Sequence, residues 1–149
     1  MRVLLQRCSR ASVTVSGNVV GRIGPGLVAL VGTTHGDDLA IARDLARRVA
    51  GYRVFPDADG RTNLSVLDTQ GEVLVVSQFT LYANTKKGTR PSFVPAGEPE
   101  LARQLVDHFE SGLQDEGVAT ASGVFGAMME VELVNDGPFT ILLEKETRT

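Results

Sequence analysis

The hydrophobic pattern of the first third of the chain predicts three strands. Residues 2–15, RVLLQRCSRASVTV, and residues 18–23, NVVGRI, are rich in β-branched residues and are separated by the turn signal Ser16-Gly17-Asn18. Residues 27–33, LVALVGT, are apolar without alternation, which is typical of a strand buried on both faces. This part of the chain therefore favours a sheet with at least one central strand.

Two later stretches have the period of amphipathic helices. Asp37 or Asp38 can cap a helix that runs to about Tyr52. A second helix is predicted from about Glu98 to Leu113, where an apolar residue recurs every fourth position: Leu101, Leu105, Phe109 and Leu113.

The remaining segments are predicted as loops and strands. Residues 55–63, FPDADGRTN, read as a loop with an Asp-Gly turn. Residues 73–82 are the most strand-like stretch, and the part from Val118 to Glu144 reads as short strands broken at Gly123, Gly126 and a corner at 135–140. The order of elements predicts an α+β fold, with a mixed or antiparallel, barrel-like sheet covered by two helices.

Length and composition favour one soluble domain. The 149 residues, 42% hydrophobic and 22% charged, are enough for a single domain spanning 1–149. No apolar run approaches the roughly 20 residues of a membrane span, so we expect no membrane partner and a cytoplasmic location. The one cysteine, Cys8, excludes an internal disulfide and is expected to be buried.

Charge is distributed unevenly along the chain. The net charge is −3, yet residues 96–149 hold eleven acidic and three basic side chains. The first part is therefore basic, and it includes Lys86, Lys87 and Arg90 in the polar loop 83–97. Either a basic face for a nucleic acid or an uneven solvated surface explains this distribution.

The residues with candidate chemistry are few. His35 and His108 belong to no spaced ligand set, so no metal or cofactor is expected, and there is no phosphate loop or nucleophile elbow. The run Ser77-Gln78-Phe79-Thr80 places three polar side chains at the end of an apolar strand, where buried polar groups require partners. This run is either a ligand-binding segment or the wet face of a strand.

The corner Asn135-Asp136-Gly137-Pro138-Phe139-Thr140 lies between two strand-like runs. A compact hairpin uses Asn-Gly or Asp-Gly and continues directly into the next strand. Here a proline follows, which lacks an N–H and has a restricted φ. Gly-Pro at this corner therefore calls for an explanation beyond a turn.

Four collinear stretches resemble the D-aminoacyl-tRNA deacylase family: QRCSRASVTV, VVSQFTL, KKGTRPSF and NDGPFT. The resemblance extends over essentially the whole chain, including GYRVFPDADGRTNLSV and GVFGAMM. It implies a homodimeric hydrolase with its active site at the subunit interface. The expected reaction is cleavage of the ester between a D-amino acid, or glycine, and the terminal adenosine of tRNA.

The resemblance also implies roles for individual residues. Ser77, Gln78, Phe79 and Thr80 would form the catalytic pocket, and Gly137-Pro138 would be a Gly-cisPro motif that enters the partner's pocket and rejects L-amino acids. Arg7 and Asn135 would support this motif. The family mechanism is RNA-assisted: the adenosine 2′-OH activates water, and backbone donors of the pocket hold the carbonyl oxygen.

Three positions depart from the family pattern. Phe139 stands where valine is usual, and Asn84 and Met128 occupy positions that are more often acidic. These differences bear on fine specificity. Two alternatives remain: a non-catalytic RNA- or nucleotide-binding module that uses Lys86, Lys87 and Arg90, and a generic esterase with Thr80 as nucleophile.

Overall fold

The computed structural model describes residues 1–148. Its elements in chain order are β1 (Arg2–Val15), β2 (Asn18–Ile23), β3 (Gly26–Gly32), α1 (Leu39–Gly51), β4 (Phe55–Pro56), β5 (Thr62–Leu64), β6 (Glu72–Ser77), the 3₁₀ helix η1 (Phe79–Tyr82), α2 (Pro99–Asp115), β7 (Ala119–Ser122) and β8 (Glu130–Glu144). In the described residues no helix is both long and apolar enough to cross a membrane.

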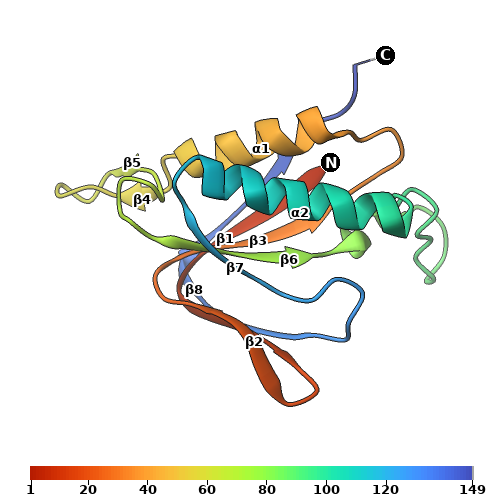
Figure 1. Ribbon diagram of the computed structural model, residues 1–149, viewed down its shortest axis with the longest axis horizontal. Helices are drawn as coiled ribbons and strands as arrows, with labels where there is room; N and C mark the ends of the chain where they lie inside the picture. The colour runs from red at the N-terminus through yellow and green to blue at the C-terminus, as the bar shows by residue number, and fades with distance from the viewer. Residues whose placement is uncertain (149) are drawn as a thin grey trace.

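The architecture is a curved mixed sheet with both long helices on one side (Figure 1). The strand order is β2-β1-β3-β6-β7, and β8 pairs with the other side of β1. Strand β1 is antiparallel to β2, β3 and β8, whereas β6 is parallel to both β3 and β7. The sheet is nearly closed, which confirms the predicted α+β, barrel-like fold.

A glycine permits the close approach of β2 to β7. A Cβ atom added at Gly21 would lie only 2.6 Å from the carbonyl oxygen of Ser122. Such a contact is too short for any side chain, so the absence of a Cβ lets the two strands curl toward each other.

The central strands are buried on both faces, as the sequence predicts. In β3, Leu27 and Val31 pack with the helices, while Val28 faces a second apolar cluster inside the curved sheet. The first cluster includes Leu45 of α1 and Phe109 of α2, both fully buried. Alternate residues therefore serve two cores, because successive side chains of a strand point to opposite faces.

Both helices form where the apolar period places them. The Asp38 carboxylate caps α1 by accepting a hydrogen bond from the Ile41 amide at 2.9 Å. In α2, Leu105, Phe109 and Leu113 are buried, but Leu101, one turn before them, is 39% exposed. The predicted apolar side of α2 is thus right for its last three turns only.

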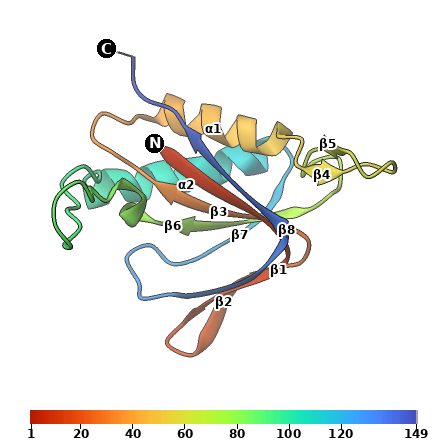
Figure 2. The same ribbon diagram turned by 180° about the vertical axis from the view of Figure 1, so that it is seen from behind.

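Three predicted elements require correction. Residues 55–63 are not all loop, since β4 and β5 pair across the Asp57–Gly60 turn. The strand predicted for 73–82 ends at Ser77, where the chain turns into η1. Finally, β8 is one strand through the 135–140 corner: it pairs with β1 on both sides of the corner, with register shifts between Gln6 and Arg10. The corner is therefore a bulge in a long strand (Figure 2).

Candidate active site

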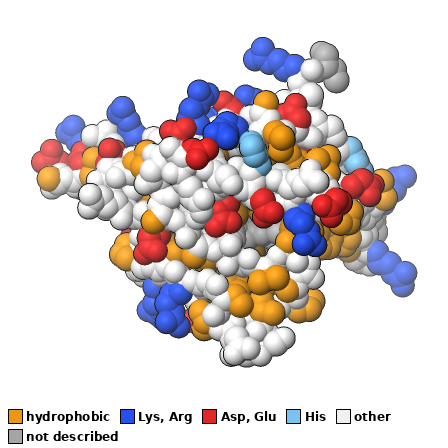
Figure 3. Space-filling view, in the orientation of Figure 1, with side chains coloured by type: hydrophobic (Ala, Val, Ile, Leu, Met, Phe, Trp, Pro, Cys, Tyr) orange, Lys and Arg blue, Asp and Glu red, His pale blue; other side chains and the backbone are white. Residues whose placement is uncertain are grey.

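One cavity of about 1080 Å³ opens beside the carboxyl end of β6. Its wall contains all four residues of the polar run, Ser77, Gln78, Phe79 and Thr80. The remaining wall comes from β3 and the loop after it, from the loop 93–98, from the start of α2 and from segment 125–131. Figure 3 shows hydrophobic side chains gathered below α2, the side on which segment 125–131 runs.

The polar run lies in the cavity because β6 ends at its mouth. The Gln78 amide still donates to the Val31 carbonyl of β3 at 2.8 Å, and the Leu81 amide then bonds to the Gln78 carbonyl to begin η1. The predicted strand therefore ends here, because the bond from the Leu81 amide to the Gln78 carbonyl turns the chain into η1.

Two backbone donors in this turn are free. Within residues 1–148, no oxygen accepts a hydrogen bond from the amide N–H of Phe79 or of Thr80. Both residues line the cavity. A pair of fixed, unpaired amides can stabilise negative charge that develops on a carbonyl oxygen.

The Thr80 hydroxyl is oriented by its neighbour. Gln78 Nε2 donates to Thr80 Oγ1, and no imidazole or carboxylate of the described residues hydrogen-bonds to that oxygen. A hydroxyl nucleophile is normally activated by an adjacent base. Within residues 1–148, the Thr80 hydroxyl is therefore not paired with a base that would activate it.

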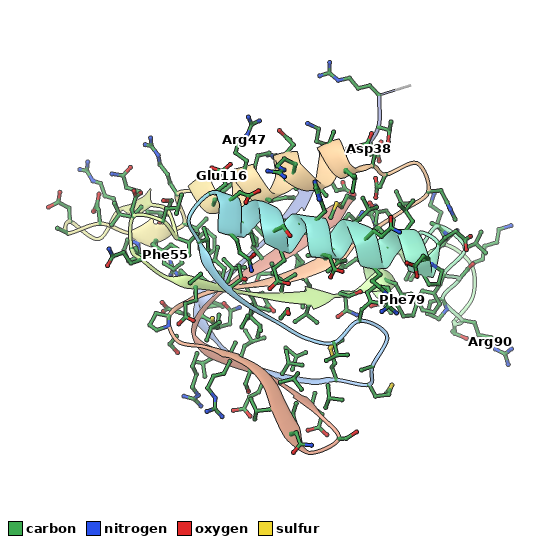
Figure 4. The ribbon with its side chains drawn as sticks, in the orientation of Figure 1. Asp38, Arg47, Phe55, Phe79, Arg90 and Glu116 are labelled. Atoms are coloured by element: carbon green, nitrogen blue, oxygen red, sulfur yellow. The ribbon has the colours of Figure 1, made fainter. Side chains whose placement is uncertain are left out.

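Two aromatic rings stand at the cavity wall. Phe79 is 56% exposed, and its ring meets Phe93 edge to face with centroids 5.1 Å apart. Figure 4 shows Phe79 at the end of β6 and Arg90 at the tip of the adjoining loop. Lys86, Lys87 and Arg90 are all exposed, and none forms an ion pair within residues 1–148.

The Gly137–Pro138 peptide bond is cis, as the resemblance implies. The φ of Gly137 is 134°, and an added Cβ would lie 2.9 Å from the Phe139 amide nitrogen, so only glycine suits this position. Both residues are exposed and lie outside the cavity of their own chain.

Arg7 and Asn135 hold this corner from its two sides. The Arg7 guanidinium donates to the Asp136 carbonyl at 3.1 Å and to the Val54 carbonyl at 2.6 Å. The Asn135 side chain accepts from the Phe139 amide and donates to Thr140 Oγ1, each at 3.0 Å. The corner is thus supported by hydrogen bonds at both ends.

Several cavity residues were missed in the sequence, because they come from segments far apart in the chain. His35, which belongs to no spaced ligand set in the sequence, lines the cavity, and its Nε2 lies 2.8 Å from the Val94 carbonyl oxygen. Glu98, Phe125 and Met128 also contribute to the wall. The GVFGAMM stretch belonged to the resemblance, but no periodicity marks it as a wall.

Cys8 takes no part in the cavity. It is buried in the inner cluster, and burial raises the pKa of its thiol from 9.0 to about 11. The expected burial of Cys8 is thus confirmed, and a thiol kept protonated in this way is a poor nucleophile.

The fold and site together define an α+β protein whose cavity, among residues 1–148, has two unpaired backbone amides and a threonine hydroxyl that is not paired with a base. Comparisons with known proteins give the family. A family model described as D-Tyr-tRNA(Tyr) deacylase matches residues 4–144. The chain therefore belongs to the D-Tyr-tRNA(Tyr) deacylase family, which is a family of enzymes.

Curated relatives are similar over nearly the whole chain. A D-aminoacyl-tRNA deacylase from Thermomicrobium roseum is 58% identical, covering 97% of this chain and 94% of the relative. The corresponding protein of Exiguobacterium sibiricum is 51% identical, with 97% and 100% covered.

Solved structures share the fold. One titled c-Myc DNA Unwinding Element Binding Protein superposes with a TM-score of 0.91 at 38% identity, covering 99% of this chain and 100% of that one. Another, titled a probable eukaryotic D-amino acid tRNA deacylase, has a TM-score of 0.80 at 17% identity, covering 95% and 97%. At that identity the second likeness concerns the fold alone.

Proposed function

We propose that this protein, acting as one domain over 1–149, hydrolyses the ester bond of D-aminoacyl-tRNA and of mischarged glycyl-tRNA. The observation that carries the proposal is the cavity in which two free amide donors, of Phe79 and Thr80, stand beside an oriented hydroxyl and no paired base. An aminoacyl ester is an activated acyl group, and its adenosine supplies a 2′-OH. A pocket that positions the ester and stabilises the oxyanion formed during hydrolysis can therefore catalyse the reaction without a nucleophile of its own.

In the proposed reaction the 2′-OH of the terminal adenosine activates a water molecule. The water oxygen forms a bond to the ester carbonyl carbon, and the negative charge on the carbonyl oxygen is held by the two amides. The tetrahedral intermediate then breaks its bond to the adenosine 3′-oxygen, which takes the proton that the attacking water has lost and leaves as the 3′-OH of the tRNA. The free amino acid is the other product, and the protein undergoes no covalent change.

The wall residues with acid–base capacity fit secondary roles. Among residues 1–148, His35 is the one histidine of the cavity wall, and its Nε2 lies 2.8 Å from the Val94 carbonyl oxygen. This contact ties the loop after β3 to the loop that carries Phe93. We assign His35 to the shape of the cavity wall rather than to proton transfer.

The Gly137–Pro138 corner is proposed to enter the cavity of a second copy of the chain. Its exposure, together with the support from Arg7 and Asn135, suits a rigid probe that is presented outward. A rigid wall on one side of the substrate Cα obstructs an L side chain, whereas glycine and D-amino acids pass. Discrimination by obstruction requires no contact with the side chain, so many D-amino acids are accepted.

Incubation of the purified protein with matched D- and L-aminoacyl-tRNA tests the function. We expect the D-aminoacyl and glycyl esters to be hydrolysed and the L-aminoacyl ester to survive. Binding of tRNA without hydrolysis would instead indicate an RNA-binding module. Hydrolysis of simple esters without a ribose would indicate a generic esterase.

Cross-linking tests the position of the corner. The side chain of Asp136, which precedes Gly137, is 59% exposed. Met128, in the cavity wall, is 91% exposed. Single variants Asp136→Cys and Met128→Cys, mixed and treated with a short bis-maleimide, should give a covalent dimer. As a control, Asp136→Cys is mixed with Val19→Cys, whose cysteine is exposed on β2 away from the cavity wall. This pair should give no covalent dimer. Failure of the first pair to cross-link would place the corner elsewhere.

A further inference from the structure

We propose that Arg2 is a positioning residue for the reaction: it holds η1, and with it the two free amides, in the geometry that stabilises the oxyanion. The inference rests on the proposed function. Arg2 lies outside the cavity wall, so it acts through η1 and touches no substrate.

The Arg2 guanidinium contacts η1 in two ways. Its Nη1 donates to the Leu81 carbonyl at 2.7 Å, and its Cζ lies 4.4 Å from the centre of the Tyr82 ring. The last carbonyls of a helical turn have no partner within the turn, and Arg2 supplies a donor to one of them, that of Leu81. Arg2 therefore caps the end of η1 opposite to the free amides of Phe79 and Thr80.

The arginine is itself anchored. Arg2 Nε is paired with the Glu144 carboxylate of β8, and Arg2 and Glu144 are direct partners in the β1–β8 ladder. On the other side of β1, Arg2 is the ladder partner of Gly32 in β3. A Cβ at Gly32 would lie 2.9 Å from the Gln78 carbonyl oxygen and 3.0 Å from the Leu81 Cβ, so η1 sits directly on this strand end.

Arg7 and Arg2, both in β1, make the same three kinds of contact, Arg7 with the Gly137–Pro138 corner and Arg2 with η1 and Glu144. Arg7 donates to the Asp136 carbonyl, lies over the Phe139 ring and pairs with the Asp136 carboxylate at 3.6 Å. Arg2 likewise meets a carbonyl, a ring and a carboxylate. One strand thus presents a planar, five-donor cation to the cavity turn and another to the Gly137–Pro138 corner, a geometry that lysine cannot reproduce.

The loss of Arg2 should slow the chemical step and leave binding unchanged. Amides aimed at a developing oxyanion contribute in the transition state, so their misplacement lowers kcat without raising KM. For Arg2→Met we expect kcat to fall about tenfold, the scale of a small misplacement. Arg2→Lys should recover only part of the loss. The control Arg43→Met removes an exposed ion pair with Asp115 between α1 and α2, and should keep wild-type kcat.

Chemical rescue separates positioning from general stability. Millimolar guanidinium chloride should restore part of the kcat of Arg2→Met, while sodium chloride at the same concentration should not. Equal kcat for wild type and Arg2→Met, or a loss that guanidinium does not reverse, would overturn the proposal. If Arg2→Met does not fold, Glu144→Gln removes the anchor of Arg2 instead and should lower kcat about two- to threefold. An unchanged kcat in Glu144→Gln would also overturn the proposal.

An activity-independent measurement distinguishes this inference from the proposed function. In ¹⁵N spectra, Arg2→Met should shift the amide resonances of Phe79–Tyr82, and Arg43→Met should not. If wild-type protein fails to deacylate D-aminoacyl-tRNA but these shifts occur, the proposed function is wrong while the anchoring of η1 stands. If the η1 resonances do not move, Arg2 does not position the turn.

Discussion

The Arg7 guanidinium lies over the Phe139 ring, with Cζ 5.0 Å from the ring centre. Phe139 directly follows the Gly137–Pro138 corner and is one of the places where this chain departs from the expected family pattern. The ring also packs against the helix-side core. The larger residue therefore has two structural partners, the arginine that supports the corner and the core beneath it.

Phe139→Val should lower the free energy of unfolding by about 1–2 kcal/mol. The variant loses apolar contact with the core and the cation–π contact with Arg7. Urea unfolding of both proteins measures the difference, with Phe139→Leu as the variant that keeps most of the volume but lacks the ring face. A Phe139→Val protein as stable as wild type would show that the ring adds nothing to the corner.

Thr80→Ala should reduce single-turnover hydrolysis of D-aminoacyl-tRNA by about tenfold, because the variant loses only a positioning hydroxyl. A covalent nucleophile would instead cost about three orders of magnitude or more. The measurement includes Thr80→Ser, which retains the hydroxyl and should remain close to wild type.

A substrate ending in 2′-deoxyadenosine should bind normally and barely react, since the proposed activation of water comes from the 2′-OH. Full activity on this substrate would defeat the RNA-assisted mechanism whatever Thr80→Ala does. His35→Gln is the companion variant, because it removes the imidazole that lines the cavity. It should retain most of the hydrolysis rate.

Neutralising Lys86 and Lys87 together should weaken tRNA binding and flatten its salt dependence. Each lost phosphate contact reduces the slope of log K against log salt by about one, so two should reduce it by roughly two. Filter binding at several salt concentrations gives the slope. Arg43→Gln together with Arg48→Gln on α1 is the matched change of two charges and should leave the slope unchanged. An unchanged slope for the loop variant would mean that the loop is merely solvated.

Cys8 should resist alkylation in the folded protein. Burial raises the pKa of its thiol to about 11, so the folded state disfavours the thiolate relative to the unfolded chain. The stability that Cys8 contributes by binding its proton more tightly in the folded state is fully present below pH 9.0. It is lost as the pH rises from 9.0 through about 11, so the free energy of unfolding should fall over that range. Iodoacetamide at pH 8 should label the protein only in denaturant, and rapid labelling of native protein would contradict the buried position.

The elements defined by local pattern were predictable from the sequence. Apolar runs and turn residues located β1, β2 and β3, and the helical period with an aspartate cap located α1. These features depend on burial and on backbone geometry within a few residues of each other. The polar run at 77–80 and the Gly-Pro corner also stood out locally, because each breaks the pattern that surrounds it.

Tertiary structure alone decided how these pieces are used. The Gln78 amide bonds to Val31 and η1 packs on Gly32, so contacts with β3 fix the point at which the polar run leaves its strand. The pairing of β8 with β1 carries one strand through the corner. The cavity takes His35 from one loop and Met128 from another, 93 positions apart in the numbering. Hydrogen bonds and contacts between such distant residues leave no period in the sequence, since they form only when the chain has folded.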